Sequence, residues 1–232
     1  MNRAAEIAQQ KALPSISPCA MIPLGMADPT YIPGIAPTVL GSPRHSLLVR
    51  TTHWIHTAAF LGLLVSGIAI LLAHPRLYWG EAGGVGAPSL IDLPLPFVLT
   101  GQTGWGRSLH FLSAWVCVLA GLPYVLSGIF GCHFRDDFFS SQTLYNPIQR
   151  VAYVAVVFGL FPLIVATGLA MSPAISSVFP ELVVLLQGQQ SARTIHFFVA
   201  ALLVVFLIAH VTMVVRAGFI HRMRGMITGE RL

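Results

Sequence analysis

The stretch from Ile195 to Val215 reads IHFFVAALLVVFLIAHVTMVV and contains no Asp, Glu, Lys or Arg. At about 1.5 Å of rise per residue, a helix of this length crosses the roughly 30 Å hydrocarbon core of a bilayer. Three further stretches, Trp54–Ala73, Leu109–Gly131 and Val151–Met171, are also free of charged residues. Because a backbone in lipid must satisfy its own hydrogen bonds, all four stretches predict transmembrane helices. We expect an all-α membrane protein, a bundle of four helices at about 50–73, 107–131, 149–171 and 193–216.

The placement of charge indicates how the bundle is oriented. Only 9% of the 232 residues are charged, whereas a soluble domain carries roughly 25%. With four spans both chain ends lie on one side of the membrane, and that side holds ten Lys and Arg residues against three on the other. Basic residues favour the cytoplasmic side, so we expect a multi-pass membrane protein with both termini in the cytoplasm. The net charge of +5 then reflects topology and requires no nucleic-acid partner. The ten are Arg3, Lys11, Arg44, Arg50, Arg135, Arg150, Arg216, Arg222, Arg224 and Arg231, and the three are Arg76, Arg107 and Arg193.

The segments outside the spans carry weaker signals. Residues 1–44 are rich in Pro, Ala, Ser and Met and contain no apolar run of signal-peptide length, so we expect a flexible cytoplasmic arm before a membrane domain at 45–232. The outer connection that follows the first span contains the apolar, proline-broken run from Asp92 to Phe97. This run either lies at the membrane interface or is a plain loop. The cysteines are widely spaced and form no zinc or redox motif, and no Cys-x-x-Cys-His is present to attach haem covalently.

Histidines inside the spans carry the chemistry, because an ionisable residue in a bilayer is a functional hypothesis by default. His53 begins the first span at the cytoplasmic side, whereas His110 lies near the outer end of the second. In the fourth span, His196 lies near the outer face, and His210 follows 14 residues later, about 21 Å deeper and on the same helix face. The depths match in two pairs, His110 with His196 and His53 with His210. This geometry suits two stacked haems, each held by two imidazoles, and such ligation favours electron transfer over oxygen chemistry.

A repeated Arg-x-x-His spacing supports this interpretation. Arg50, Arg107 and Arg193 each precede a proposed ligand by three residues, so each guanidinium lies one turn nearer the water than its histidine. Arginine pairs well with carboxylates, and we expect these residues to contact haem propionates. The alternative is that they are interfacial anchors.

Two other patterns leave alternatives open. His56 follows His53 by one helical turn, and we interpret it as a residue near a quinone or as a packing residue, with His53 as the ligand. The pairs Ser66-Gly67, Ser127-Gly128 and Thr167-Gly168 recur in the first three spans. Small residues allow close approach of helices or of a flat cofactor, and ordinary helix packing is the default explanation for them.

The motifs Arg50-Thr-Thr-His53-Trp54 and Gly106-Arg107-Ser-Leu-His110, followed by His196 and His210, resemble those of di-haem b-type cytochrome subunits of bacterial respiratory complexes. That family includes the formate dehydrogenase gamma subunit, nickel–iron hydrogenase cytochrome b and thiosulfate reductase cytochrome b. The resemblance covers about residues 45–231 and implies the same four histidine ligands. It also implies a quinone site near His53, His56 and His210, and a periplasmic partner of the molybdenum oxidoreductase, hydrogenase or formate dehydrogenase type.

The sequence therefore predicts an electron-transfer subunit with two haems b, linking a periplasmic redox enzyme to membrane quinone, with no substrate-catalytic domain of its own. One alternative is a transporter or proton relay that uses the buried histidines. The uncharged spans supply no carboxylate for such a relay. Another alternative is a haem-free membrane anchor for an enzyme complex. Haem content distinguishes these possibilities.

Overall fold

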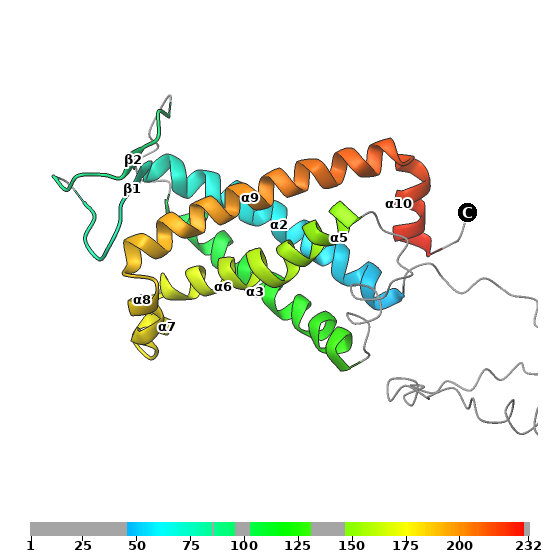
Figure 1. Ribbon diagram of the computed structural model, residues 1–232, viewed down its shortest axis with the longest axis horizontal. Coiled ribbons are helices and arrows are strands. Elements are labelled where there is room, and N and C mark those ends of the chain that lie inside the picture. Colours follow the sequence, from blue (N-terminus) through cyan, green and yellow to red (C-terminus); the bar gives the residue numbers. More distant parts are fainter. Residues whose placement is uncertain (1–45, 85, 96–102, 131–146, 230–232) are drawn as a thin grey trace, which may run out of the picture.

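A computed structural model describes residues 46–84, 86–95, 103–130 and 147–229 (Figure 1). Within them, four helices are long and apolar enough to span a membrane, in agreement with the predicted bundle. The predicted arm at 1–44 lies outside the described residues, as do His45, His133, Cys19 and Cys132.

The spans are longer than the uncharged stretches alone indicate. The first is α2 (Leu47–Ala73), the second α3 (Thr103–Phe130) and the fourth α9 (Gln189–Arg216). The third consists of α5 (Pro147–Val154), a π-helical turn (Ala155–Leu160) and α6 (Phe161–Ala170). The predicted starts at about 50, 107, 149 and 193 are late by a few residues, because each helix continues past its predicted start toward the interface, where polar groups can cap it. Ser46, for example, caps α2 by accepting a hydrogen bond from the Val49 N–H at 3.3 Å.

The wide turn in the third span has a local cause. Pro162 lies in the first turn of α6 and has no N–H to donate to a carbonyl of the preceding turn. A π-helical turn directly before a proline absorbs this lost hydrogen bond without ending the helix.

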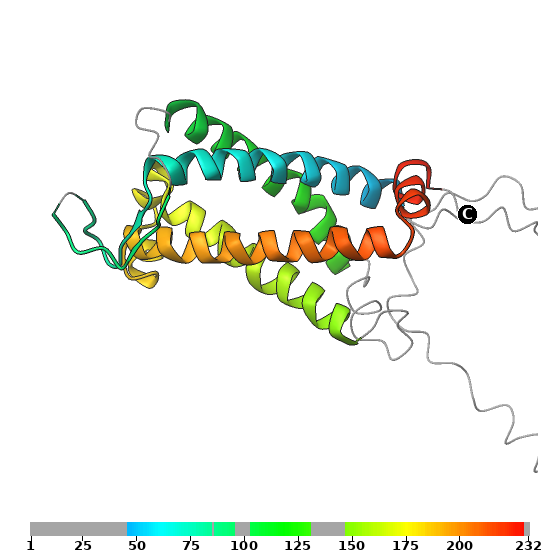
Figure 2. The ribbon, with the colours of Figure 1, turned by 90° about the horizontal axis from the view of Figure 1, so that it is seen from above.

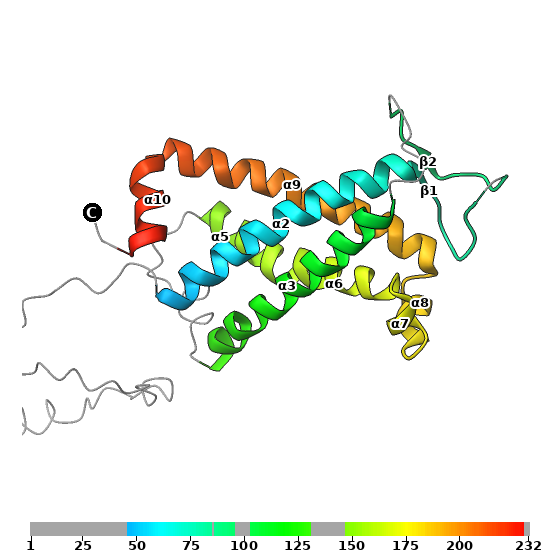
Figure 3. The ribbon, with the colours of Figure 1, turned by 180° about the vertical axis from the view of Figure 1, so that it is seen from behind.

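The bundle packs as two helix pairs that face each other. α2 packs along α3, and α6 packs along α9. Figure 2 shows α2 and α9 side by side, and Figure 3 shows α3 running beside α2. Val156, Val199 and Leu203 form a buried cluster between the third and fourth spans. Large apolar side chains on the outer surface remain exposed, such as Leu61, Leu119 and Val205, as expected for a surface that lipid covers.

One end of the bundle carries a short β-hairpin, and we call it the hairpin end. Strands β1 (Arg76–Leu77) and β2 (Ile91–Asp92) pair antiparallel, and Arg76 forms an ion pair with Asp92 at 3.1 Å. Asp92 thus belongs to a strand, which the interfacial interpretation of residues 92–97 did not predict; residues 96 and 97 lie outside the described part. Two short helices, α7 (Pro173–Ser176) and α8 (Pro180–Leu185), lie at the same end (Figure 1).

The segment after β1 is tied to the start of α9. The Thr194 hydroxyl donates to the Tyr78 carbonyl at 2.6 Å, and the Ser191 hydroxyl accepts from the Gly80 N–H at 2.7 Å. Gly188 precedes α9 with φ +115° and ψ 163°, a conformation that is essentially restricted to glycine. Its backbone lies directly against Gly80, so that a Cβ at 188 would overlap the Gly80 carbonyl group.

The opposite end carries α10 (Phe219–Thr228), and we call it the α10 end. After Gly218, with φ +94°, the chain turns across the end of the bundle (Figures 1 and 2). Arg50 donates to the Ile227 carbonyl at 2.6 Å, and the Trp54 indole donates to the Met226 carbonyl at 3.2 Å. The basic tail of the sequence therefore forms a helix docked on the start of α2.

We expect Gly188→Ala to lower the free energy of unfolding by at least about 2 kcal/mol, because a side chain is strained in this backbone conformation and overlaps Gly80. Thermal unfolding in detergent, followed by helical circular dichroism, measures the loss. Gly84→Ala is the matched control, since no atom lies within 4 Å of a Cβ built there. Equal unfolding midpoints for the two variants would contradict this account of the hairpin end.

Candidate functional site

His110 of α3 and His196 of α9 face each other near the hairpin end. Their ring centroids are 6.1 Å apart, and the ring planes are tilted by 59°. Both residues are partly buried inside the bundle. The structure thus brings together the two histidines that the sequence assigned to one depth.

His53 of α2 and His210 of α9 form a second pair near the α10 end. Their ring centroids are 6.5 Å apart with planes tilted by 48°. Phe206 stacks on His210 with centroids 6.0 Å apart and planes tilted by 24°, and the Trp54 ring meets His53 edge-on at 5.3 Å. The second pair is therefore framed by aromatic rings.

The spacing of both pairs fits two imidazoles that hold one metal ion. A ligating nitrogen lies about 2 Å from a first-row metal and about 1 Å from its own ring centre, so opposed imidazoles have centroids roughly 6 Å apart. Each pair offers only two ligands. Within the described residues, no cluster of three or more His, Cys, Asp or Glu could complete a metal site. Two axial imidazoles with a macrocycle in the remaining positions is the ligand set of haem iron.

Two buried hydroxyl groups contact the pair at the hairpin end. The Ser66 hydroxyl lies 3.0 Å from His110 Nδ1, and the Thr167 hydroxyl lies 3.0 Å from His196 Nδ1. The neighbouring glycines also face these rings, because a Cβ on Gly67 would lie 3.8 Å from His110 Cε1 and one on Gly168 would lie 3.5 Å from His196 Cε1. Two of the three small-residue pairs in the sequence thus contact imidazoles, which the packing explanation did not anticipate. The repeated hydroxyl-glycine order was the signal available in the sequence.

His56 occupies a different position from His53. Its Nδ1 lies 2.7 Å from the Thr52 carbonyl, and its Nε2 points at Gly121 of α3, 3.2 Å from where a Cβ would lie. Because a carbonyl only accepts, His56 Nδ1 carries the proton. His53, one turn earlier, is the residue that faces His210.

The three arginines lie at the two ends of the bundle. Arg193 donates to the His74 carbonyl at 2.6 Å, as Arg50 donates to that of Ile227. Each guanidinium has five N–H groups, so these bonds fix the side chain and leave donors for a further acceptor. Arg50 Nε is buried and has no hydrogen-bond partner among the described residues. A carboxylate at this position would satisfy it.

His74 and His221 lie outside the pairs and are exposed. Partial burial lowers the pKa of His74, and the nearby charges of Arg193 and Arg107 lower it further. His74 is therefore neutral at pH 7, and its contact with the start of α9 runs through its backbone.

Paired imidazoles inside a bundle of four membrane helices define a membrane-bound b-type cytochrome. Residues 44–229 match the family described as Prokaryotic cytochrome b561, and the chain belongs to that family. It is thus a multi-pass membrane protein that binds haem b and transfers electrons.

Two relatives agree with this assignment. The chain is 29% identical over 191 residues to the putative protein-methionine-sulfoxide reductase subunit YedZ1 of Azospira oryzae, a match that covers 73% of this chain and 89% of the relative. It is 31% identical over 153 residues to the putative cytochrome YdhU of Escherichia coli, a match that covers 59% of this chain and 56% of that protein.

Proposed function

We propose that this chain carries electrons across the bacterial inner membrane, between an oxidoreductase partner at the periplasmic side and quinone at the cytoplasmic side, through two haems b. One observation carries the proposal: four histidines face each other in two pairs, one near each end of the bundle. A single haem would account for only one of the two histidine pairs.

Each pair would hold one haem, His53 with His210 and His110 with His196. When bound, haem iron would supply a one-electron couple, and ligation by two imidazoles favours electron transfer over oxygen chemistry. The two histidines of α9 are 14 residues apart, about 21 Å along the helix. One rigid helix therefore sets the separation of the two centres.

The three arginines are placed to bind the propionates of the two haems. The buried Arg50 Nε, which has no partner among the described residues, supports an acceptor near His53. Arg107 and Arg193 precede His110 and His196 by one turn and lie at the hairpin end. Arginine forms strong charge-assisted bonds with carboxylates, so each propionate pair has a cation at its own end of the bundle.

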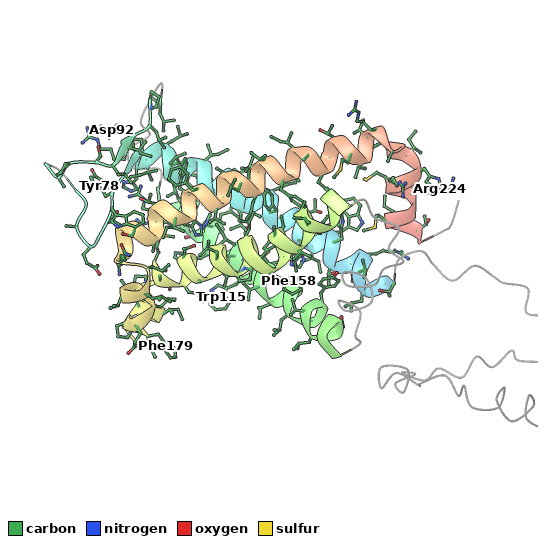
Figure 4. The ribbon with its side chains drawn as sticks, in the orientation of Figure 1. Tyr78, Asp92, Trp115, Phe158, Phe179 and Arg224 are labelled. Atoms are coloured by element: carbon green, nitrogen blue, oxygen red, sulfur yellow. The ribbon has the colours of Figure 1, made fainter. Side chains whose placement is uncertain are left out.

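Charge along the described residues supports the orientation. Arg216, Arg222 and Arg224 lie at the α10 end, and the acidic residues Asp92 and Glu181 lie at the hairpin end. Figure 4 shows Asp92 and Arg224 at opposite ends. The excess of basic residues favours the cytoplasm for the α10 end, which leaves the hairpin end for the partner enzyme. The name of the Azospira relative supports an oxidoreductase as that partner.

A groove at the α10 end suits the quinone. Its volume is about 360 Å³, and it is lined by Leu47, Arg50, Thr51, Trp54, Ile55, Met226 and Ile227. Its wall residue Trp54 contacts His53. Ile55 is 43% exposed on the lipid-facing surface, so a quinone reaches the groove from the bilayer. The apolar lining with one cation fits a ring that carries carbonyl oxygens.

We expect His196→Ala and His210→Ala each to lose one of two haems, because each substitution removes half of one ligand pair. His74→Ala, which changes an exposed histidine outside the pairs, keeps both. Haem per chain, measured as the pyridine haemochrome of purified protein in detergent, tests this. If His196→Ala retained two haems, the ligand assignment would be wrong, and a colourless wild-type protein would favour a transporter or an anchor.

We expect Ile55→Trp to slow reduction of the haems by duroquinol at least severalfold, because the larger side chain fills the groove. Haem content should not change. Ile68→Trp is the matched control, since Ile68 lies on the same helix outside the groove and is 49% exposed. Stopped-flow absorbance after mixing with duroquinol measures both rates. Equal rates of haem reduction in the two variants would show that the quinone does not bind in this groove.

A further inference from the structure

We propose that Ser66 and Thr167 are positioning residues that hold His110 and His196 with Nδ1 protonated, so that both rings present Nε2 to the same iron. This inference rests on the proposed function, since it assigns a role around the haem at the hairpin end. It concerns residues on two helices, α2 and α6, that supply no ligand to that haem.

The direction of each hydrogen bond follows from counting hydrogens. The Ser66 hydroxyl donates to the Gly62 carbonyl at 2.6 Å, and the Thr167 hydroxyl donates to the Leu163 carbonyl at 2.8 Å. A hydroxyl has one hydrogen, and a carbonyl can only accept. Each hydroxyl therefore accepts from the imidazole that lies 3.0 Å away, and Nδ1 is the donor.

Each hydroxyl has a second acceptor on its own helix, Ser66 with the Leu63 carbonyl at 3.1 Å and Thr167 with the Ile164 carbonyl at 3.0 Å. Because both neighbouring carbonyls can only accept, the hydrogen of the hydroxyl points at the backbone and its oxygen faces Nδ1–H. A neutral imidazole with its proton on Nδ1 keeps a lone pair on Nε2.

The same arrangement, a buried hydroxyl that contacts an imidazole of the neighbouring helix, occurs once in each half of the bundle. In α2 it serves the ring of α3, and in α6 it serves the ring of α9. Ser66 and Thr167 are both 0% exposed. Alanine would fill such positions in a tight helix contact without a polar atom, so helix packing alone does not explain two buried hydroxyls that each meet a ring nitrogen.

Ser127-Gly128 in α3 provides an internal comparison. The Ser127 hydroxyl donates to the Tyr124 carbonyl at 2.8 Å and is exposed, and no hydrogen bond to an imidazole is described for it. The dipeptide is the same as Ser66-Gly67, but the surroundings differ. A Ser-Gly pair in a membrane helix therefore has no fixed role, and the facing histidine distinguishes the two cases.

The hydrogen bond also affects the redox couple. An acceptor on Nδ1–H makes the imidazole a stronger donor to the metal, and a stronger donor stabilises ferric over ferrous iron. Loss of the hydroxyl should raise the midpoint potential of the haem at the hairpin end and leave that of the other haem unchanged.

The experiment compares Ser66→Ala, Thr167→Val, Thr167→Ser and Ser127→Ala in the purified full chain. Thr167→Val keeps the shape and removes the hydroxyl, whereas Thr167→Ser keeps the hydroxyl. We expect Ser66→Ala and Thr167→Val to raise one midpoint potential in an optical redox titration. We also expect haem affinity at that site to fall roughly ten- to hundredfold, measured as faster haem transfer to apomyoglobin. Thr167→Ser and Ser127→Ala should behave as wild type.

The outcomes separate this inference from the function on which it rests. Haem-free wild-type protein would overturn both. A different result would overturn only the positioning role. In it, the wild type binds two haems, and Thr167→Val has the same midpoint potentials and the same rate of haem transfer as Ser127→Ala. If Ser66→Ala does not fold, the Thr167→Val and Thr167→Ser pair still decides the question. A lowered stability with unchanged potentials would make these residues structural only.

Discussion

The structure depends on one constraint: two imidazoles on the same face of α9, about four helical turns apart, must each meet a partner ring at their own depth. His110 lies in the first half of α3 and His53 in the first half of α2, and these antiparallel helices begin at opposite ends of the bundle. Each therefore delivers its histidine to a different end of α9. The antiparallel arrangement of α2 and α3 thus allows both histidines of α9 to face a partner ring.

The remaining elements hold this arrangement in register. The third span supplies no histidine, but it contributes Thr167 and packs its apolar face against Val199 and Leu203 of α9. The Ser191 hydroxyl accepts from the Gly80 N–H and the Thr194 hydroxyl donates to the Tyr78 carbonyl, and these two bonds fix the start of α9 close to His196. At the other end, α10 docks on the first turns of α2 beside His53. Each histidine pair therefore has a set of tertiary hydrogen bonds at its own end of the bundle.

The four spans were predictable because absence of charge over about 20 residues is a sufficient signal in lipid. The rise of a helix per residue was then enough to predict which histidines of these spans lie at the same depth. The β-hairpin and α10 were not predictable, since two-residue strands and a docked tail depend on tertiary contacts such as Arg76–Asp92 and Arg50 with Ile227. The hydroxyls were visible in the sequence but not interpretable, because Ser66 meets a ring 44 residues away and Thr167 meets one 29 residues away.

The most direct test of the central claim is the amount and spin state of haem in the purified wild-type chain. Pyridine haemochrome with protein quantification gives the haem-to-chain ratio, and electron paramagnetic resonance of the oxidised protein gives the coordination. The proposal predicts two b-type haems per chain, both low-spin and six-coordinate. One haem, none, or a high-spin ferric signal from intact protein would contradict the account.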